Sequence, residues 1–385
     1  MKVAVTAAET IDDVLPGEWD RLVADEGFYL SHDWLRFVAA EPNEDSRYLL
    51  ARDDDGVLIG GLVLTQIRDA KTARYRPQHF DELLGTGDDI LVAGATRGYR
   101  SSLLLAGAAD SRPEVLAALL REALTIAQAQ RRAGIVLPYL TSGALTEVAD
   151  LVRVRVGFEL PEAELRGIGA GITEYAAAAS RRVRTKIRSD RKRFADAGWR
   201  LRERDLRECW RDAARLFGNL RSKYGHGDQD LAELEATLAG QARLLADRAV
   251  TFTCEDDAGI VGIAVWYRWR DTLYGRLAGF DYDRLRGGAE YFTVAIYGPA
   301  DYAARHGVTT MHLGTGSWEA KGYRGAILSP LWSAFIPADA QLGLSGLDLV
   351  NASVADRWAR DIAQRSITMD AGKWHLGSYR AGSVA

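Results

Sequence analysis

Residues 284–289, Arg-Leu-Arg-Gly-Gly-Ala, open a helical pattern that runs to Gly307. Apolar side chains on this helix keep a 3.6-residue period, and the pair Gly298-Pro299 predicts a kink. An apolar strand, Val308–Leu313, comes next and leads into a second loop, Gly314-Thr-Gly-Ser-Trp-Glu-Ala-Lys-Gly-Tyr-Arg-Gly-Ala326. A glycine-rich turn, a helix, a buried strand and a second glycine-rich loop, in this order, predict an α/β fold.

The composition is that of a globular protein with more than one domain. A chain of 385 residues is too long for one ordinary hydrophobic core, and its length favours two domains. It is 47% hydrophobic and 26% charged, as soluble proteins are. No apolar run approaches the roughly 18–20 residues of a membrane span, and the N-terminus lacks the pattern of a signal peptide. Two cysteines, Cys209 and Cys254, form no disulfide framework, so a cytoplasmic location is expected.

One set of elements occurs twice along the chain: a hairpin across an Asp-rich turn, then a helix that ends in glycine before a buried strand. The repetition predicts two tandem α/β domains, 1–168 and 169–385, with mixed, mainly antiparallel sheets flanked by helices. Only the second copy has a glycine-rich turn before its helix. Residues 68–99 are expected to form an inserted loop with short elements. The matched segments are Asp53–Gly60 with Asp256–Gly262 and Ala123–Leu140 with Ala300–Gly314.

The turn at 284–289 has the chemistry of an anion site. Its glycines, Gly287 and Gly288, would leave backbone N–H groups unpaired at the positive end of a helix dipole, which suits a pyrophosphate. The pattern Arg284-x-x-Gly287-x-Ala289 resembles the Arg/Gln-x-x-Gly-x-Gly/Ala loop of the GNAT superfamily of N-acetyltransferases. In that loop backbone amides hold the pyrophosphate of coenzyme A. An ordinary glycine-rich turn is the alternative.

A wider pattern resembles one branch of that superfamily, the Fem-type aminoacyltransferases and the CelD/BcsL-type, peptidoglycan-biosynthesis-like N-acyltransferases. The resemblance implies two tandem GNAT-like domains, the first on the acceptor side and the second on the acyl-donor side. It also implies attack of an amine on an activated acyl ester or thioester, with aminoacyl-tRNA or acyl-CoA as the donor. The segments that carry the resemblance are Gly17–Asp20, Phe28–Trp34, Ser180–Phe194, Tyr274–Gly279, Asp281–Asp283, Tyr291-Phe292, 312–314 and 321–326.

Lys321 is the leading catalytic candidate, because the resemblance places it where Fem-type enzymes have a lysine near the acyl group. Its ammonium would stabilise the oxyanion that develops at the carbonyl. A surface lysine on a loop is the alternative. Arg324 would clamp a phosphate or carboxylate bidentately, or would pair with a nearby acid. Tyr323, between them in sequence, is predicted to contact the donor.

The resemblance implies no fixed general base, and the sequence has no Ser-His-Asp or Cys-His set. Asp281 and Glu290 are candidates to accept the proton of the attacking amine, as are Asp283 and His312. His312 falls inside a predicted buried strand, which favours a satisfied core histidine. The histidines and cysteines show no metal-ligand spacing, so no metal is expected.

A basic helix, residues 180–194, opens the second half. Between Arg181 and Arg193 the chain has eight basic residues and a single acid, Asp190. Arg184 and Arg188 lie on one predicted face, which would suit tRNA phosphates or an anionic substrate. A solvated face neutralised by nearby acids is the alternative. Tyr224, in a loop between two helices, is predicted to line the acceptor cleft.

Together these features favour a bacterial-type biosynthetic N-acyltransferase that forms an amide on a small amine-bearing acceptor. The basic helix and the Fem-like layout favour an aminoacyl-tRNA donor over an acyl-CoA donor. No permanently bound cofactor is expected. The competing class is a non-catalytic tandem-domain protein that binds a ligand or a cell-wall fragment.

Overall fold

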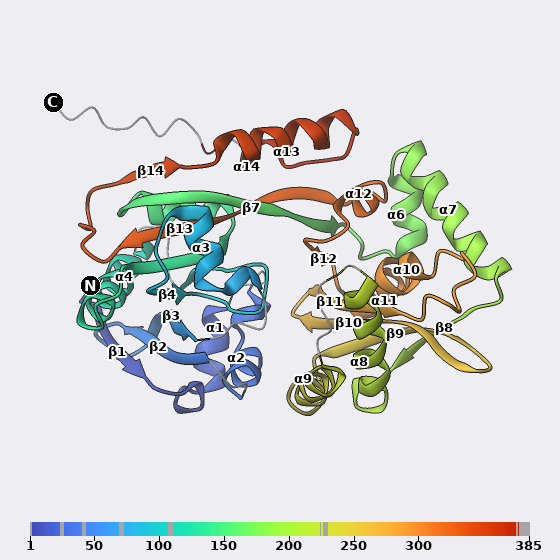
Figure 1. Ribbon diagram of the computed structural model, residues 1–385, viewed down its shortest axis with the longest axis horizontal. Coiled ribbons are helices and arrows are strands. Elements are labelled where there is room, and N and C mark those ends of the chain that lie inside the picture. The colour runs from blue at the N-terminus through green and yellow to red at the C-terminus, as the bar shows by residue number, and fades with distance from the viewer. Residues whose placement is uncertain are drawn as a thin grey trace. The chain divides into compact units, whose positions relative to one another are not determined.

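The computed structural model (Figure 1) divides into two compact units. Unit 1 takes in the chain up to Pro161, Ser329–Arg365 and the residues from Met369 on, and unit 2 takes in Glu162–Leu328 and Ser366–Thr368. Within them the mixed α/β class, with mainly antiparallel strands flanked by helices, is confirmed. The structure describes residues 2–23, 27–40, 44–68, 73–106, 111–223, 225, 230–374 and 376.

The first boundary lies close to the one predicted at residue 168, but unit 2 differs from the expected segment 169–385. Strand β13 (Ile327–Pro337) is the reason, because its apolar residues from Trp332 on pair antiparallel with β6 (Gly134–Leu140) in unit 1. The chain that follows β13, including α13 (Ala352–Gln364), stays largely in unit 1. A long buried strand therefore returns the chain to the first unit.

In unit 1 the strands run in the order β1-β2-β3-β4-β6-β13, and β4–β6 is the one parallel pair of this series. Two neighbouring glycines of β3 show how helices cover the sheet. A Cβ on Gly60 would meet Val115 at 2.5 Å, and one on Gly61 would meet Trp19 at 2.9 Å. Since successive strand residues point to opposite faces, α4 and α1 lie on opposite faces of β3. The elements are β1 (Ala4–Ala8), α1 (Pro16–Leu22), α2 (His32–Ala39), β2 (Glu44–Arg52), β3 (Leu58–Ile67), α3 (Pro77–Leu84), β4 (Ile90–Ala93), β5 (Leu104–Leu105), α4 (Arg112–Ala129), β6, α5 (Ser142–Ala149), most of β7 (Arg153–Arg166), β13, β14 (Gly346–Leu349), α13 and α14 (Ala371–Trp374).

In unit 2 the end of β7 begins the series β7-β12-β11-β10-β9-β8, in which β11–β12 is the one parallel pair. Helix α8 packs so closely on β11 that a Cβ on Gly279 would lie 2.3 Å from the backbone of Leu216, so glycine is required there. The elements are α6 (Ile172–Ala178), α7 (Arg181–Asp196), β8 (Arg200–Arg204), α8 (Leu206–Lys223), α9 (Leu231–Leu244), β9 (Ala249–Asp256), β10 (Gly259–Trp269), β11 (Thr272–Phe280), α10 (Glu290–Phe292), the π-helical segment η4 (Thr293–Tyr297), α11 (Gly298–His306), β12 (Thr310–Gly314) and α12 (Trp318–Gly322).

The two units repeat one topology, as the sequence predicts. Each has a hairpin (β2–β3, β9–β10) and a parallel pair (β4–β6, β11–β12) whose strands are joined by a helical crossover, α4 in unit 1 and α10–α11 in unit 2. A parallel pair needs such a crossover, which is why a helix precedes a strand in both halves. In unit 2 the helix ends at Gly307 as predicted, but in unit 1 α4 ends at Ala129 and the predicted terminal glycine, Gly134, is the first residue of β6. The short elements expected within residues 68–99 include α3 and β4. At the predicted kink, Gly298-Pro299, the π-helical η4 ends and α11 begins, so the helix is irregular there.

None of the helices within the described ranges is long and apolar enough to cross a membrane.

Candidate active site

The parallel strands β11 and β12 part after a short pairing. Their register runs from Thr272 opposite Thr310 to Tyr274 opposite His312, although β11 continues to Phe280. β12 ends at Gly314, whose φ of +73° turns the chain away from the strand. Where two paired strands separate, backbone groups lose their ladder partners and become available to other groups. This opening in the sheet of unit 2 is the centre of the candidate site.

Lys321 reaches the opening from α12. Its Nζ donates to the carbonyl of Leu313 at 2.6 Å and lies 3.5 Å from that of Gly314, so the side chain is anchored at the end of β12. The residue is only 6% exposed. Burial lowers the pKa of this ammonium from 10.5 to about 7, because a charged amine loses its hydration. Lys321 is therefore a buried group that titrates near neutrality, which a surface lysine would not be.

His312 pairs with a glutamate that the sequence analysis did not single out. Its Nε2 lies 2.7 Å from Glu162 Oε2, and both side chains are almost fully buried. The imidazole also lies against the ring of Tyr274, with 5.4 Å between centroids. The prediction of a core histidine agrees with this burial, but only Nε2 is satisfied, because Nδ1 is buried and has no hydrogen-bond partner among the described residues. Glu162 lies within the long strand β7, and no motif in the sequence marks it.

The guanidinium of Arg324 is already paired with a side chain of the protein, so it is not free to bind an anionic ligand. Its guanidinium donates to Asp190, its Nε donates to the Tyr297 hydroxyl at 2.9 Å, and NH1 donates to the Ala320 carbonyl at 2.7 Å. Asp190 is the single acid of the basic run, and it is fully buried. Of the two predicted roles of Arg324, pairing with a nearby acid is the one that the structure contains.

The basic helix α7 borders an open groove of about 690 Å³. Arg182 stacks over the ring of Tyr323, with its Cζ 4.4 Å from the ring centroid. The lining therefore combines cations, small hydroxyls and one aromatic ring. The lining residues are Arg181, Arg182, Thr185, Lys186, Ser189 and Tyr323.

Two of the arginines predicted to bind a donor lie elsewhere on α7. At 100° per residue, Arg184 and Arg188 fall on a face adjacent to the one that lines the groove. Arg184 donates to the carbonyl of Ala177 at 3.0 Å, and Arg188 is exposed. The groove thus brings Tyr323 and the basic helix together, both predicted to bind the donor, but its cations are not the predicted Arg184 and Arg188.

The glycine-rich turn is folded around a side chain of its own. Gly287 has a φ of +70° and Ala289 a φ of +61°, so the turn needs two left-handed residues. Glu290 then bends back, and its Oε1 accepts the backbone N–H of Arg286 at 2.9 Å and the indole N–H of Trp199 at 2.9 Å. Arg284, the first residue of the predicted donor-binding turn, donates to Asp256 at 2.6 Å.

Glu290 is buried, and two effects on its acidity oppose each other. Burial raises the pKa, but N–H donors from the backbone of residues 286, 288 and 290 and from Trp199 lower it, and the net shift is downward. A carboxyl whose proton leaves so readily is a weak proton acceptor, so the geometry does not favour Glu290 as a general base. Asp281, the other predicted acid, follows β11 in a half-buried turn. Tyr224 lies outside the described residues.

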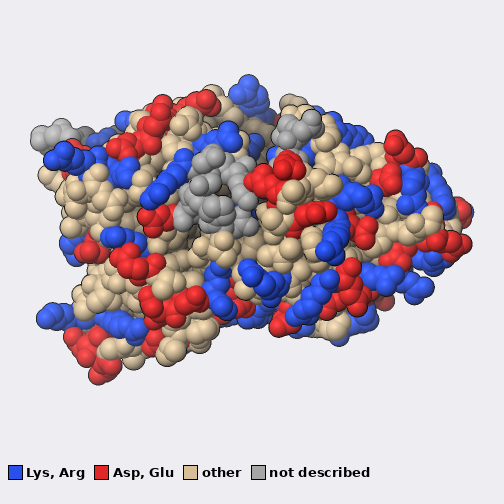
Figure 2. All heavy atoms as spheres, turned by 60° about the horizontal axis from the view of Figure 1, so that its bottom comes forward, with Lys and Arg blue, Asp and Glu red and all other residues tan. Residues whose placement is uncertain are grey.

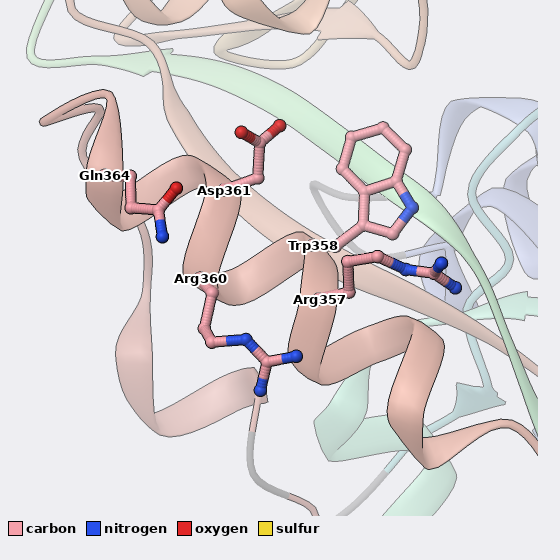
Figure 3. Close-up of a pocket in the computed structure, with 5 residues that line it drawn as sticks. All are labelled: Arg357, Trp358, Arg360, Asp361 and Gln364. Carbon is pink, nitrogen blue, oxygen red and sulfur yellow. The ribbon is translucent and has the colours of Figure 1, made fainter.

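A second hollow, of about 440 Å³, lies beside α13 in unit 1. Figure 3 shows its labelled side chains leaving the helix in several directions. Arg365 already donates to Asp361 at 3.0 Å. Among the described residues that line this hollow, the polar groups therefore do not point toward a common ligand position. Across the described ranges, no group of three or more His, Cys, Asp or Glu side chains is placed to hold a metal ion. The lining residues are Arg357, Trp358, Arg360, Asp361 and Gln364.

Comparison with known proteins identifies the family. Residues 96–351 match the model of the FemAB-like family, described as peptidoglycan biosynthesis/recognition. That match spans more than half of the chain, so the protein belongs to the FemAB-like family. A comparison with curated protein sequences found no match.

Three solved structures share the fold at low sequence identity. The crystal structure of FemX has a TM-score of 0.62 and 15% identity, over 88% of this chain and 98% of that one. A tandem GNAT protein from the clavulanic acid biosynthesis pathway has a TM-score of 0.51 and 14% identity, over 88% and 99%. L-PGS from Bacillus licheniformis has a TM-score of 0.51 and 14% identity, over 83% and 91%. The tandem GNAT-like fold predicted from the sequence is confirmed.

Proposed function

We propose that the protein is an N-acyltransferase that joins the aminoacyl group of an aminoacyl-tRNA to the amine of a small acceptor. The observation that carries the proposal is the buried Lys321 at the end of β12, where β11 and β12 separate. A cation held away from water stabilises negative charge on a carbonyl oxygen far better than a solvated one does. In the reaction the C–N bond forms, the C–O bond to the ribose breaks, and the ribose oxygen takes up the proton that the amine loses.

The groove beside α7 supports a nucleic-acid donor. Arg181 and Lys186 supply positive charge for phosphates, and the ring of Tyr323 supplies a surface on which a base can stack. Figure 2 shows basic and acidic side chains interspersed over the face it presents, and the net charge of the chain is −4. Attraction for a polyanion therefore has to be local, and α7 carries eight basic residues against two acids, Asp190 and Asp196.

The hydrogen bonds within the glycine-rich turn argue against acyl-CoA, the alternative donor for an enzyme of this fold. The N–H groups of Arg286 and Trp199 already bond to Glu290, and Arg284 already bonds to Asp256. A pyrophosphate would have to break these bonds before it could form its own. Membership of the FemAB-like family supports the same choice.

The test is an acyl-transfer assay with radiolabelled aminoacyl-tRNA and a panel of small amines and peptidyl amines. Wild-type protein is expected to move the label from tRNA to an acceptor. Lys321→Ala is expected to lower kcat by about 10²–10³-fold, the loss typical of one oxyanion donor. Lys373→Ala, which removes a partly exposed lysine paired with Asp370 in unit 1, is the matched control and should leave the rate unchanged.

Two results would contradict the proposal. Unchanged activity of Lys321→Ala would remove the proposed role of the lysine. Saturable ligand binding without transfer from any donor would favour the non-catalytic alternative.

A further inference from the structure

We infer that the carboxylate of Glu290 is the resident anion of the glycine-rich turn, and that it closes this turn to the pyrophosphate of a coenzyme-type donor. The part of this inference that concerns the donor rests on the proposed acyl transfer. The part that concerns the turn rests on contacts within unit 2 alone.

The contacts are those of a complete anion site. Glu290 Oε1 accepts the N–H of Arg286 and the indole N–H of Trp199, each at 2.9 Å, and the backbone N–H groups of Gly288 and Glu290 also act on this carboxylate. Backbone N–H groups that converge in a tight turn form a concavity that binds anions. Here a carboxylate from the same chain fills that concavity.

Neighbouring residues fix the carboxylate in place. A Cβ on Gly288 would lie 2.9 Å from Ala197 and 3.3 Å from Glu290 Oε1, so the turn closes around the carboxylate only with glycine at this position. The Arg286 guanidinium lies over the Trp199 ring at 4.0 Å and donates to Asp256 at 2.9 Å. The indole that donates to Glu290 from its edge therefore also has a guanidinium over its ring.

The two arginines of the turn do not offer an alternative phosphate site. Arg284 and Arg286 both donate to Asp256, one to each carboxylate oxygen, at 2.6 and 2.9 Å. The carboxylates of Asp256 and Glu290 therefore already pair with the arginines and the N–H donors of the turn. An incoming pyrophosphate, which carries more negative charge, would meet both carboxylates.

The inference is tested by removing the carboxylate and supplying an anion. Glu290→Ala is expected to lower the Tm of unit 2 by on the order of 5 °C, because several buried donors lose their acceptor. Millimolar pyrophosphate or inorganic phosphate should then raise the Tm of Glu290→Ala saturably and leave that of the wild type unchanged. CoA should bind Glu290→Ala at least tenfold more tightly than it binds the wild type.

Two further variants control the experiment. Ile263→Ala removes a fully buried side chain of β10 and lowers stability without touching the turn, so it should show no saturable response to these anions. Glu290→Gln keeps the volume of the side chain but not its charge. It should be less stable than the wild type and equally insensitive to pyrophosphate, because the turn remains filled. If Glu290→Ala folds only in phosphate buffer, the inference is supported, and if phosphate does not restore its folding, the inference is overturned.

Other outcomes separate this inference from the proposed function. Equal anion responses of wild type and Glu290→Ala, or wild-type stability of Glu290→Ala, would overturn the inference. Turnover of acyl-CoA by the wild type at a rate that matches aminoacyl-tRNA would overturn the exclusion of coenzyme donors. Absence of acyl transfer with every donor, combined with anion rescue of Glu290→Ala, would remove the proposed function and leave the assignment of the turn intact.

Discussion

Asp190 and Arg324 form a salt bridge that solvent does not reach, with side-chain exposures of 0% and 2%. The Tyr297 hydroxyl completes the cluster, because it donates to Asp190 at 2.7 Å and accepts from Arg324 Nε at 2.9 Å. Arg324 also holds the carbonyl of Ala320, the residue before Lys321. On the other side, the ammonium of Lys186 in the groove lies 3.5 Å from Asp190. This cluster therefore connects the basic groove to the helix that carries Lys321.

Breaking this pair on one side should destabilise unit 2 strongly. Arg324→Met leaves the carboxylate of Asp190 buried without its main counter-charge, and losses of about 3–5 kcal/mol are typical of that change. The loss should appear as a lower urea midpoint in equilibrium unfolding. The double variant Asp190→Leu/Arg324→Met removes both charges and should be less destabilised than Arg324→Met alone. Additive losses in the double variant would show that the two charges do not interact.

The elements with regular patterns could be predicted from the sequence, and so could their repetition. Apolar periodicity marks the helix before β6 in unit 1 and the helix before β12 in unit 2, and a terminal glycine, Gly307, marks the end of the second. Strand β8, by contrast, reads Arg-Leu-Arg-Glu-Arg, and its side chains are mostly exposed at the edge of the sheet. An edge strand needs little apolar surface, so periodicity carries no signal for it.

Only the part of the site that forms a local sequence pattern could be predicted. Lys321 and Tyr323 could be found because the glycine-rich loop around them forms a local pattern. The partners of Arg324 in this loop and of His312 in β12 could not be found, since Asp190 and Glu162 come from distant parts of the chain and reach them only through tertiary packing. Glu290 shows the same limit. Its residue type suggested a proton acceptor, and only the positions of the surrounding N–H donors show that it is held as an anion.

Neutralising one cation of the groove should weaken tRNA binding. Arg181→Gln is expected to raise the Kd for aminoacyl-tRNA and to reduce the slope of log Kd against log salt by about 1, as the loss of one phosphate contact does. Arg188→Gln, on the adjacent face of α7, is the matched control with the same change of charge. Filter binding at several salt concentrations measures both. Equal effects of the two variants would mean that the helix acts through its overall charge and that the groove is not the contact surface.

The two cysteines should resist thiol reagents in the native protein. Burial raises the pKa of both Cys209 and Cys254 to about 12, and the charge of Glu290 adds to the shift at Cys254. The thiolate, which is the reactive form, is therefore scarce at pH 8. A disulfide-exchange reagent should react slowly with native protein and rapidly with both thiols in denaturant. Fast reaction of one thiol in native buffer would show that its surroundings open more readily than the packed structure implies.

Replacing Lys321 by methionine should stabilise the protein at neutral pH. The folded-state pKa of about 7 lies below the ordinary 10.5, so between these values the unfolded chain binds a proton that the folded chain does not. Wild-type stability therefore rises with pH from about 7 to 10.5, and the penalty for burying the charge is largest below pH 7. Lys321→Met lacks this penalty and should be more stable than the wild type by roughly 2–4 kcal/mol at pH 6. Urea unfolding at pH 6, 8 and 10 should show the difference shrinking as pH rises, and a constant difference would contradict the buried titration.

The same titration should appear in the rate of acyl transfer. If the ammonium of Lys321 stabilises the developing oxyanion, kcat falls as pH rises through about 7, because the lysine loses its proton and its charge. Lys321→Arg retains a charge that cannot be removed in this range, so its residual rate should not fall over the same pH interval. Steady-state rates from pH 5.5 to 9 with saturating aminoacyl-tRNA measure both profiles. The opposite outcome is a wild-type rate that rises as pH increases through 7, together with loss of activity in Lys321→Arg. That outcome would assign Lys321 as the neutral amine that accepts the proton of the attacking nucleophile.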